Sequence, residues 1–136
     1  MTSAEALQDW LAIEHEAVWL YPVIGARFDD LANRARRSYA LHRNLRDRLL
    51  ARLDDLGVEP VATALTYDVG PLRTKAQALS QARRVERDVA AACLTLTGES
   101  SGELRAFATR ELRRAALAEL AWGAQPRAFP GLPAQS

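Results

Sequence analysis

The sequence predicts an all-α fold, a four-helix bundle with a long crossover between the second and third helices. Four segments carry apolar residues at steps of three and four, which is the spacing of one helix face. The connection over residues 58–71 is long enough to run from one end of a bundle to the other. No segment alternates apolar and polar residues convincingly, as a half-buried strand would.

The first helix is expected over residues 4–28. Ser3 is a suitable N-cap, because its hydroxyl can accept a hydrogen bond from a free N–H of the first turn. Pro22 lies inside the apolar pattern and lacks a backbone N–H, so we expect it to kink the helix near Val18. Gly25 follows and would let a neighbouring backbone approach closely.

The second helix is expected over residues 30–56, with Asp29 or Asp30 capping its start. Gly57 can adopt the left-handed conformation that ends many helices, and a proline follows shortly after it. The arginines of this helix predict a solvated face that pairs with nearby carboxylates.

The third helix is expected over residues 72–97, and Gly98 ends it. The fourth is expected over residues 100–123, opened by serines. These segments predict one domain over residues 1–124.

The chain closes with a proline-rich tail over residues 125–136, which is not expected to be helical. Phe129 and Leu132 give this tail apolar side chains, so we expect it to pack back onto the bundle.

The charge balance and the composition exclude several classes of protein. The net charge is +1, with 18 basic against 17 acidic residues, so no basic excess or interleaved aromatics favour nucleic-acid binding. Cys93 is the single cysteine, and no stretch is apolar enough to span a membrane. Residues 1–9 lack the pattern of a signal peptide, so we expect a cytoplasmic protein.

Three polar residues stand in the apolar stripes of three different helices: Glu14, His42 and Glu86. Glu111 has a similar position on the fourth helix, where two rotations are possible. A buried carboxylate needs hydrogen bonds, a counter-charge or a metal ion. Glutamates and histidines projecting from bundle helices are also the ligands of di-iron and di-manganese centres.

Several short motifs are similar to those of a known family. They are Glu14-His15-Glu16-Ala17-Val18 followed by Tyr21, Gly25-Ala26-Arg27, His42-Arg43, Arg46-Asp47 and Phe129-Pro130-Gly131. With the helix plan, they resemble the ferritin-like superfamily, and more narrowly an actinobacterial ferritin-like family, domain of unknown function 4439. The resemblance spans nearly the whole chain. It implies a ferritin-like fold and brings no established activity.

The sequence departs from the ferritin-like metal pattern at two Glu-x-x-His slots. The slot on the second helix has Tyr39 in place of its glutamate, ahead of His42, and the slot on the fourth has Arg114 in place of its histidine, after Glu111. Arginine stays protonated and cannot ligate a metal, but it can supply the positive charge of one. We therefore expect a degenerate site without a resident metal, in which His42 and Arg114 neutralise the glutamates. The alternative is iron or manganese held by Glu14, His42 and Glu86.

Three hypotheses about function remain open. The favoured one is a non-catalytic bundle that acts as a homodimer or with another protein partner, because the first helix is apolar on more than one side. We expect Trp10 and Trp19 to be partly exposed on this helix. The second is an iron or manganese oxidase or carrier, to which His15 could add a ligand. The third is a small-ligand pocket at the bundle centre, lined by Tyr39, His42 and the glutamates.

Overall fold

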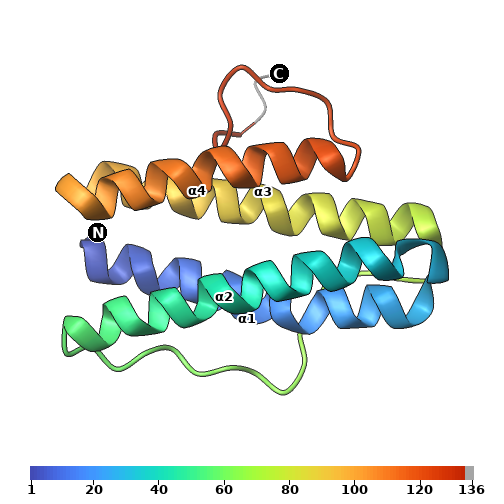
Figure 1. Cartoon of the computed structure of the whole chain (residues 1–136), viewed down its shortest axis with the longest axis horizontal. Coiled ribbons are helices and arrows are strands. Elements are labelled where there is room, and N and C mark those ends of the chain that lie inside the picture. The colour runs from blue at the N-terminus through green and yellow to red at the C-terminus, as the bar shows by residue number, and fades with distance from the viewer. Residues whose placement is uncertain (134–136) are drawn as a thin grey trace.

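The computed structural model describes residues 1–133, which form long helices and no strand (Figure 1). A single 3-10 turn, η1 (Asp29–Leu31), joins the first helix to the second. The four long helices of this part of the chain are α1 (Ser3–Arg27), α2 (Ala32–Asp55), α3 (Lys75–Glu99) and α4 (Gly102–Ala121). The predicted all-helical architecture is therefore confirmed. None of these helices combines the length and the apolar character needed to cross a membrane.

The helices form two antiparallel pairs, α1 with α2 and α3 with α4, that join where α1 packs against α3 (Figure 1). Within the described residues, α2 and α4 have no Cα atoms within 8 Å of each other. Arginines of α2 close the seam between them: the Arg34 guanidinium lies 4.1 Å from the centre of the Trp122 ring, and that of Arg52 lies 4.2 Å from the centre of Phe107. The predicted solvated face is confirmed for the exposed Arg36 and Arg37 and for the ion pair between Arg46 and Asp47, whereas Arg34 and Arg52 also pack on aromatic rings.

The start of α1 differs from the prediction by one residue. Thr2 is the N-cap: its hydroxyl accepts a hydrogen bond from the Glu5 amide at 3.1 Å, and its own amide donates to the Glu5 carboxylate at 2.7 Å. The hydroxyl of Ser3, the predicted cap, donates instead to the backbone carbonyl of Glu99. The helix continues through Pro22 to its end.

The other helix ends combine confirmed and corrected predictions. Neither predicted aspartate caps α2, because η1 leads into the helix and Leu31 takes the N-cap position. Gly57 has φ of +66°, which confirms the left-handed stop. Helix α3 starts after Thr74, which forms a capping box with Gln77, and it continues past Gly98.

The crossover between α2 and α3 runs along α1 (Figure 1). The Gln8 side chain donates to the carbonyl of Glu59 at 2.6 Å and accepts from the amide of Val61 at 2.8 Å. The ring of Trp19 lies 6.0 Å from that of Tyr67, centre to centre. The apolar sides of α1 thus face α2, α3 and this crossover.

This arrangement changes the interpretation of the first helix. Trp10 is fully buried, so its predicted exposure is wrong, whereas Trp19 is partly exposed as expected. A helix with three packing partners needs apolar residues on several sides. The width of its apolar surface therefore no longer indicates an interface with another chain.

The tail packs back on the bundle through other residues than predicted. Gly131 has φ of +86° and lies so close to α3 that a Cβ there would be 2.9 Å from the carbonyl oxygen of Ala90. Arg127 lies 4.0 Å from the carboxylate of Glu119 on α4. Phe129 and Leu132, predicted to make this contact, are 67% and 46% exposed. Residues 134–136 of the predicted tail lie outside the described residues.

Candidate functional site

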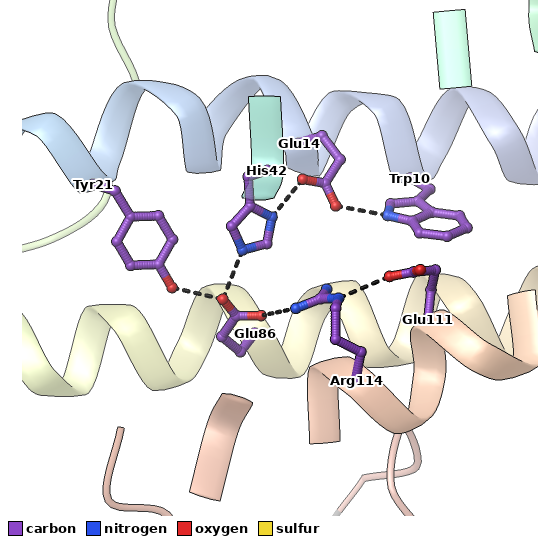
Figure 2. Close-up of polar contacts among 7 residues, drawn as sticks. All are labelled: Trp10, Glu14, Tyr21, His42, Glu86, Glu111 and Arg114. Carbon is purple, nitrogen blue, oxygen red and sulfur yellow. Dashed lines mark hydrogen bonds and ion pairs between the residues drawn. The ribbon is translucent and has the colours of Figure 1, made fainter. Parts of the chain in front are cut away.

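The three predicted stripe residues meet at the centre of the bundle, with His42 of α2 in the middle (Figure 2). Its Nδ1 lies 2.5 Å from Oε2 of Glu14 on α1, and its Nε2 lies 2.7 Å from Oε1 of Glu86 on α3. All three side chains are buried, with at most 1% of each exposed. Each falls on the buried face of its helix because it continues that helix's apolar stripe.

Two aromatic residues that sequence reasoning left out of the site complete the bonds to the carboxylates (Figure 2). Trp10 donates from its indole N–H to Oε1 of Glu14 at 2.8 Å, and Tyr21 donates from its hydroxyl to Oε1 of Glu86 at 2.7 Å. The Tyr21 ring also stacks on the imidazole of His42, with ring centres 5.4 Å apart. Trp10 lies one turn before Glu14 on α1, and Tyr21 lies two turns after it, so all three share one helix face. This spacing could have identified both aromatics from the sequence.

Arg114 brings the fourth helix into the same network. Its Nη1 lies 3.7 Å from Oε2 of Glu86, and its Nε donates to Oε2 of Glu111 at 2.8 Å. Glu111 also lies 3.9 Å from Arg48 of α2, near the edge of the bundle. We call Glu14, His42, Glu86 and Arg114 the central cluster, to which each helix contributes one residue.

The pKa values of three residues in the central cluster, His42, Glu86 and Arg114, favour their charged forms. Burial alone would lower the pKa of His42, but the carboxylates of Glu14 and Glu86 outweigh it and raise this pKa to about 10. Burial likewise opposes ionisation of Glu86, and His42 and Arg114 outweigh it, so the pKa of this carboxyl is lowered. Burial alone would lower the pKa of Arg114, but the carboxylates of Glu86 and Glu111 outweigh it and raise this pKa.

The central cluster is therefore balanced in charge: two carboxylates face an imidazolium and a guanidinium. His42 donates a hydrogen bond from each ring nitrogen, one to each glutamate. Charges this deeply buried are tolerated only when they are paired and hydrogen-bonded. Here protein side chains supply the opposite charges, although Oε2 of Glu86 and Nη2 of Arg114 have no hydrogen-bond partner among the described residues.

The donor set does not fit a di-iron or di-manganese centre. Both ring nitrogens of His42 lie within hydrogen-bonding distance of carboxylates, and Tyr39 stands where the metal-binding pattern has a glutamate. Arg114 stands beside Glu86 where a ligand would be needed. Across residues 1–133, no group of three or more His, Cys, Asp or Glu residues is arranged to hold a metal ion.

The remaining predicted site residues lie elsewhere. His15 does not reach the central cluster; its Nε2 lies 3.0 Å from the carbonyl oxygen of Val61 and ties the crossover to α1. Tyr39, predicted as a partner of the glutamates, contacts Arg43, whose guanidinium lies 5.5 Å from the centre of its ring. Tyr39 lines a surface cleft between α1 and α2, and Tyr21 lies between that cleft and His42.

The fold and the central cluster define a helical-bundle protein with a buried, charge-balanced polar core. The chain belongs to the family described as Domain of unknown function (DUF4439), whose model matches residues 6–134. It is similar in structure to a conserved hypothetical protein, rv2844, from Mycobacterium tuberculosis. That crystal structure has a TM-score of 0.84 and 28% sequence identity, over 94% of this chain and 96% of the other. No curated protein matches the chain.

Proposed function

We propose that this protein is a ferritin-like bundle in which protein charges have replaced the metal ions, and that it acts non-catalytically through association with a second copy of itself. The observation that carries the first part is the position of His42, which donates from both ring nitrogens to Glu14 and Glu86. Arg114 then adds the second positive charge where the metal-binding pattern requires a histidine.

The burial of the central cluster supports a structural role. An acid or base that takes part in catalysis must come within hydrogen-bonding distance of its substrate. Glu14 and His42 are fully buried, and their polar atoms are already bonded to other side chains. The cluster then serves to specify how the four helices pack, because each helix contributes one of its charges.

Metal analysis tests the first part of the proposal. The protein would be produced with iron and manganese in the medium, purified without chelator and analysed by mass spectrometry for both metals. We expect far less than one ion per chain. A stoichiometric ion that is lost in Glu86→Gln but kept in Glu103→Gln would refute the proposal and support the alternative, a metal-binding oxidase or carrier.

Exposed apolar side chains on α4 and the tail support the second part. Leu117 and Leu120 lie one turn apart on α4 and are 57% and 38% exposed. The tail passes Leu120 at Pro126 and Pro130, and it carries two further exposed apolar residues, Phe129 and Leu132. Neighbouring exposed apolar residues of this kind often mark a contact with another protein, and a second copy of the chain is the simplest partner.

Sedimentation of matched variants tests this association. We expect the wild type to sediment as a dimer at micromolar concentration and Leu117→Glu to sediment as a monomer. Leu41→Glu is the control, because Leu41 is also partly exposed but lies on α2. A monomeric wild type, or equal effects of the two substitutions, would rule out this interface.

A further inference from the structure

A cleft of about 420 Å³ opens at the surface between α1 and α2, near the turn that joins them. Small residues create it: Gly25 faces Ala35 so closely that a Cβ on the glycine would lie 3.4 Å from that of the alanine. Larger residues, Tyr21 and Pro22 of α1 and Arg36 and Tyr39 of α2, form the rest of the lining. Its volume lies in the range of ordinary small-molecule sites, which is roughly 300–1,000 Å³.

The lining combines apolar walls with one positive charge. The ring of Tyr39, a proline and small aliphatic residues form the walls above the buried Tyr21, and Arg36 supplies the charge. Two other arginines of α2 are paired with carboxylates: Arg46 with Asp47 at 2.9 Å, and Arg52 with Glu103 at 2.9 Å. Among residues 1–133, Arg36 has no carboxylate within 4.0 Å, so its guanidinium is free to bind an anion.

We propose that this cleft binds small aromatic carboxylic acids. The carboxylate would pair with the guanidinium of Arg36, which offers two parallel N–H donors to such a group. The ring system would lie against Tyr39 and Pro22, and the half-buried aromatic ring of Tyr39 favours stacking. This inference goes beyond the proposed function, because Arg36 and Tyr39 take no part in the central cluster.

Tyr21 links the cleft to the interior of the bundle. One part of it lines the cleft, while its ring stacks on His42 at 5.4 Å and on Trp122 at 5.7 Å, centre to centre. Tyr21 itself is fully buried, so a ligand would contact the residues beside it, such as Gly25 and Ala32. The backbone amide signals of these two residues therefore report binding in the cleft.

The experiment uses 2-naphthoate as the probe and 2-naphthamide as its uncharged counterpart. Calorimetry gives the affinity, and NMR titration of the full chain locates the site. We compare Arg36→Gln with Arg37→Gln, because Arg37 is exposed on the same helix but does not line the cleft. Both substitutions remove one surface charge, so both variants should fold.

We expect saturable binding of naphthoate with shifts of the Gly25 and Ala32 amide signals. Arg36→Gln should weaken this binding by about tenfold, the equivalent of one charge-assisted contact, whereas Arg37→Gln should leave it unchanged. Naphthamide should bind the wild type more weakly than naphthoate does. The proposal is wrong if millimolar naphthoate does not bind saturably, if the amide binds equally well, or if both variants lose the same affinity. None of these results depends on the metal content or the oligomeric state of the protein.

Discussion

Raising the pH above neutrality should destabilise this protein, because the buried imidazole of His42 must keep both protons to balance Glu14 and Glu86. The pKa of His42 is about 10 in the folded chain, against an ordinary value of 6.5. Between these two values the folded state binds one more proton than the unfolded state, so stability falls with rising pH. The contribution is fully present below pH 6.5 and is lost as the pH rises through 10.

The size of this effect follows from proton linkage. Each pH unit between the two pKa values removes roughly 1.4 kcal/mol of unfolding free energy, and the whole contribution amounts to about 5 kcal/mol. Between pH 6.5 and 8.5 the expected loss is about 2 kcal/mol, because only half of the unfolded imidazoles are protonated at the lower pH. The lowered pKa of Glu86 makes stability depend on pH at the acid end as well. The stability that ionised Glu86 contributes is present above about pH 4.5 and is lost as the pH falls further.

Urea unfolding followed by circular dichroism measures this profile. His15→Gln is the matched control, since it removes the other histidine and should leave the fall above pH 6.5 intact. His42→Gln should remove that fall, in addition to lowering stability at every pH by leaving two buried carboxylates without their cation. A wild type whose stability is flat from pH 6.5 to 8.5, or an unchanged slope in His42→Gln, would refute the reasoning.

Three further substitutions, two of them with a matched control, test individual contacts by the same unfolding assay or, for the tail, by limited proteolysis. Glu86→Gln should lower the unfolding free energy by about 3–5 kcal/mol, because a buried ion pair loses one partner. Glu103→Gln, at the exposed end of α4, should change the unfolding free energy little, and equal effects of the two substitutions would contradict a buried cluster. Tyr21→Phe should cost about 2 kcal/mol through the lost bond to the ionised Glu86, and a neutral result would argue against that bond. Gly131→Ala should make the tail sensitive to limited proteolysis, and a tail that stays protected would contradict the packing of Gly131. Its control is Gly98→Ala, which has open space around it and should stabilise α3 by about 0.5–1 kcal/mol.

The helices could be predicted from the sequence because their signals are local. Gly57 ends α2 through its own backbone conformation, and the apolar stripes need only neighbouring residues. The start of α3 was placed too early for a physical reason. Leu72 is buried and continues the apolar pattern, but it belongs to the end of the crossover, and the helix begins only after the capping box of Thr74.

The centre of the site could be predicted because Glu14, His42 and Glu86 interrupt otherwise apolar helix faces. Their partners were harder to identify. Tyr39 was chosen from its spacing to His42 on α2, whereas the hydroxyl that reaches Glu86 belongs to Tyr21 on α1, the helix that packs directly on α3. Which helices pack against each other is determined by the whole fold, so it cannot be inferred from the residue at a single position.

The same limit explains the incorrect interpretation of Trp10. A tryptophan on a second apolar side of a helix can face solvent, another chain or a covering loop. Only the course of the crossover along α1 decides between these, and it does so through contacts such as those of Gln8 with the loop backbone. Association of two copies remains a prediction, now on a different face, at Leu117 and Leu120.

The central claim is that His42 is a permanent cation that stands in for a metal charge. Nitrogen-15 NMR of the imidazole measures this directly, since both ring nitrogens of an imidazolium resonate together and those of a neutral ring are widely separated. With His15→Gln as the background, only one histidine contributes to the spectrum. At pH 8 we predict a doubly protonated ring, well above the ordinary pKa of 6.5 and below the value of about 10 in the folded chain. A neutral ring at this pH, or one that loses its proton when iron or manganese is added, would contradict the account.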